Sequence, residues 1–364
     1  DPKMRMSQTP QGYFAPGADP LEQALMINQL LEMVGEFEKP KYFVYNEKVC
    51  AHGRNGKVGC NACIDVCSTG AIGSIFKNGQ GTVEVNPNLC MGCGACSTVC
   101  PSGAMRYNYP SVPHQGKELK TLASVFTAEA KKLNQAMAPT LLLHTLKAGT
   151  QLIDGLGRSA HIMPKQFEGL PAFVIPYGIE HIASTGLDLW LGALTYGFTE
   201  VILLSSGDED PSYRAALESQ ANLANSILKA YGFDERIHLV LTDSVEDLLA
   251  VSKAMGLLRQ RGSLSPLCTP ATIDLSNQKR ETLEAALEHL QKQAKTPLPE
   301  TGAALPKSSL LGGLAINKDA CTLCMSCVSS CPEGALLDNP DEPILSFIEK
   351  QCVQCGICAQ TCPE

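Results

Sequence analysis

The stretch Cys90-Met-Gly-Cys93-Gly-Ala-Cys96-Ser-Thr-Val-Cys100 carries four cysteines separated by two, two and three residues, and Pro101 follows it. The same spacing recurs twice near the end of the chain, and proline again follows each copy. The two copies are Cys321/Cys324/Cys327/Cys331 and Cys352/Cys355/Cys358/Cys362. A structural zinc site draws four tetrahedral ligands from two separated cysteine pairs, which this pattern does not offer. Three cysteines at two-residue gaps instead wrap one loop around three corners of a four-iron cubane.

A fourth motif departs from this spacing. Nine residues separate Cys50 from Cys60, whereas Cys60, Cys63 and Cys67 keep the usual gaps, and Ser68 replaces the proline. The insert contains His52 and several cationic side chains. Because the later gaps are intact, we expect a [4Fe–4S] cluster here too; a three-iron cluster or His52 as a ligand remains an alternative. In total, sixteen of the seventeen cysteines fall into four motifs, enough for four [4Fe–4S] clusters.

The spacing is the signature of bacterial two-cluster ferredoxins, in which the fourth cysteine of each motif binds the neighbouring cluster. The ligand sets are therefore predictable. They are Cys50, Cys60, Cys63 with Cys100; Cys90, Cys93, Cys96 with Cys67; Cys321, Cys324, Cys327 with Cys362; and Cys352, Cys355, Cys358 with Cys331. Every predicted site is filled by protein thiolates, which favours an electron carrier over a catalyst.

The amino-acid composition limits the classes of partner that the chain is expected to bind. The net charge is −8 and aromatic residues make up only 5% of the 364 residues, which argues against nucleic acid and anionic membranes. Bound clusters would add negative charge, so we expect redox partners with basic docking patches. No apolar stretch is long enough to span a membrane and no secretory signal is visible. Grouped cysteines in such a chain predict metal sites in a reducing compartment, the cytoplasm. Because the chain starts at Asp1 and stops two residues after Cys362, we expect it to be part of a longer polypeptide.

Between the cysteine motifs the pattern changes to alternating strands and helices. We expect strands at 140–145, 171–176, 200–206 and 236–242, and helices at 118–137, 180–196, 211–231, 245–260 and 279–294. This alternation predicts an α/β domain with a doubly wound parallel sheet. The predicted organisation is an N-terminal arm and amphipathic helix (1–40), a two-cluster ferredoxin module (41–110), the α/β domain (118–295) and a second ferredoxin module (314–364), with linkers at 110–117 and 296–313.

The middle domain could be a spacer or a catalytic domain. Gly155-Leu-Gly157 is the only glycine-rich candidate for a nucleotide loop, and it lacks the third glycine. Gly207-Asp-Glu-Asp210 follows a predicted strand at the end where such sheets bind ligands, but its carboxylates would repel phosphate. Cys268 stands alone and is expected to be an ordinary thiol. The N-terminal helix (21–37) packs either on its own domain or on a partner.

The middle domain resembles the delta subunit of methyl-viologen-reducing hydrogenases in the stretches Gly169-Leu-Pro-Ala-Phe-Val-Ile-Pro176, Gly197-Phe-Thr-Glu-Val-Ile-Leu-Leu204 and Gly232-Phe-Asp-Glu-Arg236. That family has a cysteine and a [2Fe–2S] cluster where this chain has Tyr177, so the resemblance implies no such cluster here. The whole layout, including Asp188, resembles the four-cluster ferredoxin-like proteins that accompany proteobacterial molybdenum formate dehydrogenases.

These observations together predict an electron-transfer subunit of a larger oxidoreductase. The resemblance implies a molybdenum- or tungsten-dependent formate dehydrogenase as its partner. The alternative is a flavin- or nucleotide-dependent oxidoreductase whose active site lies in the α/β domain. A third possibility is an assembly factor whose clusters are structural.

Overall fold

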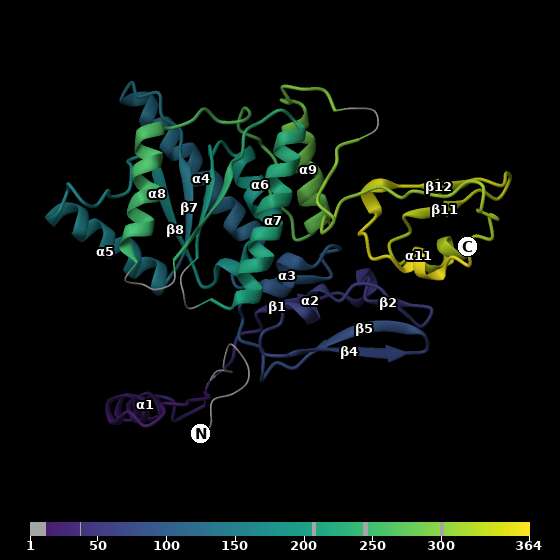
Figure 1. Ribbon diagram of the computed structural model, residues 1–364, viewed down its shortest axis with the longest axis horizontal. Helices are drawn as coiled ribbons and strands as arrows, with labels where there is room; N and C mark the ends of the chain where they lie inside the picture. The colour runs from purple at the N-terminus through teal and green to yellow at the C-terminus, as the bar shows by residue number, and fades with distance from the viewer. Residues whose placement is uncertain (1–11, 37, 206–208, 243–246, 299–301) are drawn as a thin grey trace.

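The middle of the chain folds around a four-stranded parallel sheet (Figure 1). The computed structural model describes residues 12–36, 38–205, 209–242, 247–298 and 302–364. The strand order is β10-β9-β7-β8. The strands are β7 (Thr140–Thr145), β8 (Val174–Ile179), β9 (Val201–Ser205) and β10 (Ile237–Leu241). The helices around them are α4 (Val112–Lys132), α5 (Ala148–Ile162), η2 (Ile182–Ser184), α6 (Leu187–Thr195), α7 (Pro211–Ala230), α8 (Leu248–Arg261) and α9 (Lys279–Gln291).

Alternate side chains of the buried strands pack on opposite faces of the sheet. Leu141 and Leu143 belong to a core with Trp190 of α6, while Leu142 belongs to a second core with Leu152 of α5. The inner strands β7 and β9 carry apolar residues on both faces because helices cover both, α4, α6, α7 and α9 on one side and α5 and α8 on the other (Figure 1). The sheet is parallel, as predicted; its inner strands are fully buried, whereas the edge strands β8 and β10 are partly exposed.

Four sequence expectations in this domain need correction. The helix expected at 180–196 is divided into η2 and α6, which begins only at Leu187. Helix α4 begins at Val112 and not at 118, because Pro113 lies in its first turn, where no N–H is needed. Most of the predicted linker 110–117 is therefore helical. Helix α5 was not expected. Strand β8 starts three residues later than predicted, after a turn at Pro171, and includes Pro176; as an edge strand, it tolerates the missing N–H.

The N-terminal cysteine motifs lie in a small module with two sheets. Strand β1 (Phe43–Tyr45) pairs with β6 (Met105–Tyr107), and a second sheet has the order β3-β2-β5-β4. The remaining elements are η1 (Glu47–Val49), β2 (Gly53–Arg54), β3 (Lys57–Val58), α2 (Ala62–Asp65), β4 (Ile72–Lys77), β5 (Gln80–Val85) and α3 (Ala95–Val99). Asn78 and Gly79, both with positive φ, close the β4–β5 hairpin.

The C-terminal motifs lie in a second module, yellow in Figure 1. Its elements are α10 (Ser326–Ser330), β11 (Leu336–Asp338), β12 (Leu345–Phe347), η3 (Glu349–Gln351) and α11 (Ile357–Thr361). Strands β11 and β12 pair antiparallel between the two motifs. Both cysteine-rich parts thus place a β-hairpin between two short helices.

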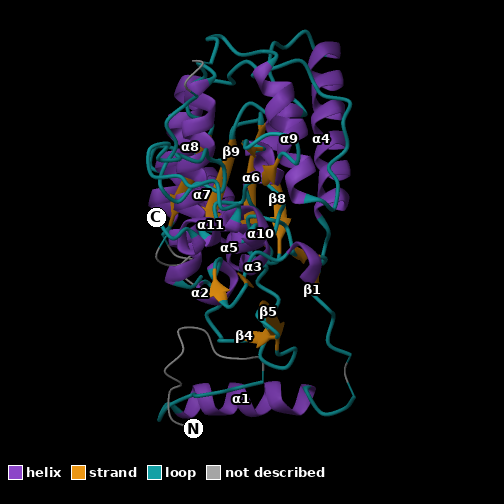
Figure 2. Cartoon of the chain, turned by 90° about the vertical axis from the view of Figure 1, so that its right-hand side faces the viewer, coloured by secondary structure: helices purple, strands orange, loops and turns teal. Residues whose placement is uncertain are grey.

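Helix α1 (Pro20–Glu32) lies apart from the rest of the chain in both views (Figures 1 and 2). None of its residues is buried, and Leu21 and Leu31 are about two-thirds exposed at 67% and 66%. The expectation that it packs on its own domain is therefore not met. Within the described residues, no helix combines the length and the apolar character needed to cross a membrane.

Candidate iron–sulfur sites

The structure brings the sixteen motif cysteines together in four groups, which we call sites A to D. Each group joins three cysteines of one motif to the fourth cysteine of the neighbouring motif, which is the combination expected from the crossover. Site A is Cys67, Cys90, Cys93 and Cys96; site B is Cys50, Cys60, Cys63 and Cys100; site C is Cys331, Cys352, Cys355 and Cys358; site D is Cys321, Cys324, Cys327 and Cys362. That these thiols bind iron stays a prediction from the motif.

Two of the groups surround a hollow. The four thiols of site A line one cavity together with Tyr42 and Tyr213, and the four thiols of site D line another. Among the described residues, no three His, Cys, Asp or Glu side chains converge tightly enough to hold a single metal ion. A cavity ringed by thiols suits a cluster, whose irons lie between the ligands, better than a lone ion at one point.

In three motifs, the backbone on either side of the second cysteine (Cys93, Cys324 and Cys355) has an unusual conformation. Residues on both sides of this cysteine have positive φ: Gly92 and Gly94 in site A, Leu323 and Met325 in site D, and Gln354 and Gly356 in site C. Alternating conformations of this kind turn successive N–H groups toward one side, forming a concave anion-binding surface. Three of the six residues are not glycine, although a left-handed residue with a side chain costs about 1–2 kcal/mol. A bound anionic cluster would offset that cost.

Burial makes the free thiolates unfavourable in these groups. Burial first, and then the charge of Cys100, raise the pKa of Cys63 to about 12; burial also raises the pKa of Cys60 to about 11. The pKa of Cys96 is raised well above its usual value for the same reason. Four thiolates need a cationic core to be stable in such a place. The chemistry of the donor set therefore fits an iron–sulfur cluster.

The four sites differ in their exposure. In site D, Cys324 and Cys362 are exposed, and a hydrogen bond with Ser326 lowers the pKa of the Cys324 thiol. Cys63 and Cys100 in site B are buried. Site D is therefore the most open of the four, and site B is more enclosed.

Comparisons with protein families support this assignment. Residues 58–104 match a family model described as a 4Fe-4S dicluster domain, and residues 314–363 match another model with that description. The chain carries two ferredoxin-type iron–sulfur domains. The first match starts after Cys50, so it does not test the ligand that precedes the insert. The matches suggest an electron-transfer role. No curated protein matches the chain.

The N-terminal module covers the carboxyl edge of the parallel sheet, where ligands of such sheets bind. The hydroxyls of Ser68 and Tyr213 hydrogen-bond at 2.5 Å, and Thr98 Oγ1 donates to the carbonyl oxygen of Ala183 at 3.2 Å. Ala183 follows β8, and Tyr213 lies in the first turn of α7, after β9. Sequence reasoning missed Tyr213, although Ser68, in place of the usual proline, was a visible signal.

The candidate nucleotide loops do not form a site in the described residues. Gly155 and Gly157 lie inside helix α5 and not at a strand-to-helix turn. Residues 206–208, which include part of the predicted acidic loop, lie outside the described residues. The next residue, Glu209, is 7% exposed and accepts hydrogen bonds from Ser205 Oγ and from the Ile182 N–H. Its carboxylate is thus held by the protein.

Two further side chains singled out by the sequence have protein partners. His52 is buried, and its two ring nitrogens contact the carbonyl oxygen of Cys60 at 2.9 Å and Ser74 Oγ at 2.7 Å. Since both nitrogens are engaged, His52 is not placed to bind iron in site B. Cys268 is buried against the carbonyl oxygens at the end of α6, which agrees with an ordinary core thiol.

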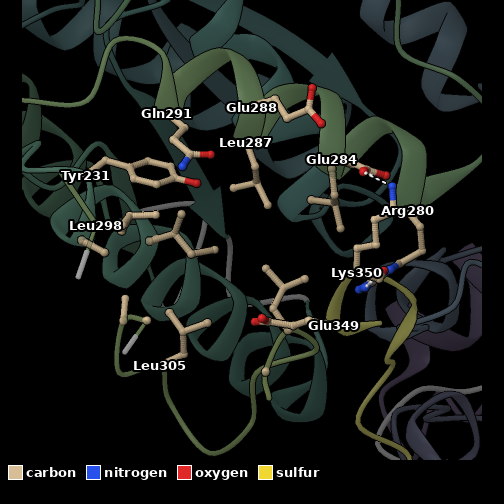
Figure 3. Close-up of a pocket in the computed structure, with 17 residues that line it drawn as sticks. Tyr231, Arg280, Glu284, Leu287, Glu288, Gln291, Leu298, Leu305, Glu349 and Lys350 are labelled. Carbon is tan, nitrogen blue, oxygen red and sulfur yellow. Dashed lines mark hydrogen bonds and ion pairs between the residues drawn. The ribbon is translucent and has the colours of Figure 1, made fainter. Parts of the chain in front are cut away.

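One pocket lies between α7, α9 and the segment after α9 (Figure 3). Leu287, Leu298 and Leu305 point into it, and Lys350 pairs with Glu284 at its rim, 3.1 Å apart. Its α7 residues, Ile227 to Tyr231, lie at the end of that helix, so the pocket adjoins the amino edge of the sheet. It therefore lies away from the edge where nucleotide cofactors bind in this architecture.

Proposed function

We propose that the chain is an electron-transfer subunit that carries single electrons through four [4Fe–4S] clusters held at sites A to D. The cysteines of sites A to D would hold the clusters, and the clusters would supply one-electron redox chemistry in which no bond of the protein is formed or broken. A larger oxidoreductase would supply the electrons, and a separate acceptor would take them up. The chain itself would catalyse no chemical conversion.

The observation that carries this proposal is the grouping of sixteen thiols in four sets of four. Each set contains three cysteines from one motif and the fourth cysteine of the neighbouring motif. Such sets hold the cluster entirely through protein thiolates and leave no iron open to a substrate. Complete ligation suits electron transfer, since catalysis at a metal requires an open position.

The packing of the N-terminal module on the middle domain argues against a flavin or nucleotide site there. Among the described residues, the N-terminal module contacts the segments that follow β8 and β9 through Ser68, Thr98 and the residues they contact. We therefore propose that the parallel sheet is a scaffold that holds the ferredoxin modules. Clusters that could not be reduced and reoxidised would instead support a structural role.

For the partner, we propose a molybdenum- or tungsten-dependent formate dehydrogenase, on the strength of the resemblance of the layout. Grouped thiols that bind clusters call for a reducing compartment, and we propose the cytoplasm. Purification of the chain from its native host would identify the partner by its cofactor. Copurification with a molybdenum- or tungsten-containing enzyme is expected, whereas a partner without either metal would overturn this part of the proposal.

An anaerobic redox titration tests the carrier role directly. We expect reversible bleaching of a broad iron–sulfur absorption band, with no flavin bands and no reduction by NADH or NADPH. Flavin absorption in the isolated chain, or its direct reduction by a nicotinamide cofactor, would favour the catalytic alternative.

A further inference from the structure

The nine-residue insert between Cys50 and Cys60 is a folded element. It forms the hairpin β2–β3, closed by Asn55 and Gly56, whose φ angles are 52° and 71°. Gly53 in this hairpin pairs with Gly81 of strand β5. The insert that makes the first motif irregular therefore extends the sheet of the N-terminal module as an ordered hairpin.

The hairpin contacts the C-terminal ferredoxin module. Arg54 Nη1 donates to the carbonyl oxygen of Cys331 at 3.1 Å, and Asn55 Nδ2 donates to Ser330 Oγ at 3.3 Å. In the opposite direction, Gln360 Nε2 donates to the carbonyl oxygen of Val58 at 2.9 Å. Cys331 is a member of site C, and Gln360 lies in helix α11, next to site C. All three hydrogen bonds thus join the insert to the part of the second module that carries site C.

Gly59 allows the two modules to approach closely at this point. A Cβ added to Gly59 would lie 2.7 Å from side-chain atoms of Ile357, which is fully buried, and 2.7 Å from the carbonyl oxygen of Ala51. Gly59 directly precedes Cys60 of site B, and Ile357 lies between Cys355 and Cys358 of site C. The loops that carry the two sites are therefore packed against each other without room for a side chain.

We propose that the β2–β3 insert and Gly59 form a junction that sets site B beside site C, so that the four sites make one series in the order A, B, C, D. This inference rests on the proposed function, because it concerns the path between the clusters. Arg54, Gly59 and Gln360 are positioning residues in this account: they fix the separation of two ligand loops and touch no cluster themselves.

The packing of the ligand-bearing segments follows the same order. Cys63 of site B and Cys96 of site A pack in one cluster, Gly59 beside Cys60 of site B lies against Ile357 in the loop of site C, and helices α10 and α11, which carry Cys327 of site D and Cys358 of site C, pack on each other. One end of the series, site A, lies against the middle domain through Tyr213. The other end, site D, has exposed cysteines. An electron entering at one end and leaving at the other reduces the acceptor by one electron, oxidises the donor by one, and leaves the chain unchanged.

The test uses the full chain with its clusters, reduced anaerobically and examined by electron paramagnetic resonance. Neighbouring reduced clusters broaden each other's spectra and speed each other's relaxation, and both effects fall steeply with distance. Gly59→Val should move sites B and C apart. We therefore expect loss of the broadening and fast relaxation that arise from the magnetic interaction between clusters at sites B and C. Gly73→Val is the matched control: it lies in the same module, and nothing lies within 4 Å of an added Cβ. Its spectrum should equal that of the parent.

A second variant guards against misfolding of Gly59→Val. Arg54→Ala combined with Gln360→Ala removes two of the hydrogen bonds at the junction, adds no bulk and leaves every cysteine in place. It should weaken the same interaction while the iron content stays at the parent level. The junction is refuted if this double variant and any iron-replete Gly59→Val protein both show the parent spectrum. Clusters that cannot be reduced in the parent would instead refute the proposed function, so the two failures are distinguishable.

Discussion

Tyr213 offers a way to change the potential of one cluster from outside its ferredoxin module. Its side chain is buried, its hydroxyl hydrogen-bonds Ser68, and it lines the cavity of site A, where burial raises the pKa of the Cys93 thiol and a hydrogen bond from Tyr213 opposes that rise. Since a tyrosine hydroxyl has a single proton, donation to Cys93 requires Ser68 to donate to Tyr213. Hydrogen bonds to ligand sulfurs stabilise the more negative, reduced state of a cluster and thereby raise its potential. Tyr213→Phe should therefore lower the potential of site A.

The magnitude follows from the strength of that bond. A hydrogen bond to a charged group contributes about 1.5–3 kcal/mol, and only the part that is gained on reduction changes the potential. Taking that part as about 1 kcal/mol, the shift is about 40 mV, since 59 mV corresponds to 1.4 kcal/mol for one electron. Ser68→Ala should shift the same potential in the same direction but less, because Tyr213 keeps its own proton.

A redox titration followed by electron paramagnetic resonance measures this shift. One of the four midpoint potentials should fall and the others should stay. Tyr177→Phe is the matched control, because Tyr177 belongs to the same domain but donates to Glu118 and not to a cysteine. An unchanged set of potentials in Tyr213→Phe, or an equal shift in the control, would show that Tyr213 does not set the potential of site A.

Three further predictions concern ligation, stability and docking. Cys100→Ala should cost about four irons per chain and remove the signal of site B, not that of site A, because the fourth cysteine of each motif crosses over; loss of the site A signal would contradict this. Gly94→Ala should lower the free energy of unfolding in two ways. The left-handed backbone at this position should cost about 1–2 kcal/mol. Overpacking should cost about 1–3 kcal/mol more, because the added Cβ would lie 2.6 Å from a side chain of η2. Gly70→Ala, with positive φ but open space, should show only the first part in denaturant unfolding. Residues 314–364 carry seven Asp and Glu against two Lys and Arg, so this module is acidic. Salt screens the attraction between an acidic module and a basic electron carrier, so electron exchange with such a carrier should slow as salt is added. Asp341→Lys should slow the same exchange at low salt. A salt-independent rate would exclude electrostatic docking at this module.

The sequence predicts most of what is regular in this molecule. Cysteine spacing determines which thiols meet, because three ligands at two-residue gaps must share one loop and the fourth must face the neighbouring site. The parallel strands were visible as apolar runs. The hairpin in the insert also had a signal, the Asn55-Gly56 pair, which favours a two-residue turn. What could not be seen was its role, since its contacts with Ser330 and Cys331 join residues some 275 positions apart.

Other features left no local trace in the sequence. Leu323, Met325 and Gln354 adopt the left-handed conformation that glycine adopts at equivalent positions of the site A motif. Leu, Met and Gln rarely adopt this conformation, so the sequence did not predict it. The bounds of β8 were misplaced because a proline usually ends a strand, so Pro176 was taken as its last residue. An edge strand can continue through a proline, and β8 does so. The coverage of the sheet by the N-terminal module depends on tertiary contacts alone, which residue patterns do not encode.

The proposed electron transfer requires the sixteen grouped thiols to hold four cubane clusters. Quantitative iron and acid-labile sulfide analysis of anaerobically purified protein tests it most directly. We expect brown protein with about sixteen irons and about sixteen sulfides per chain, four of each for every cubane. Colourless protein that contains zinc, or cysteines paired as disulfides, would contradict it.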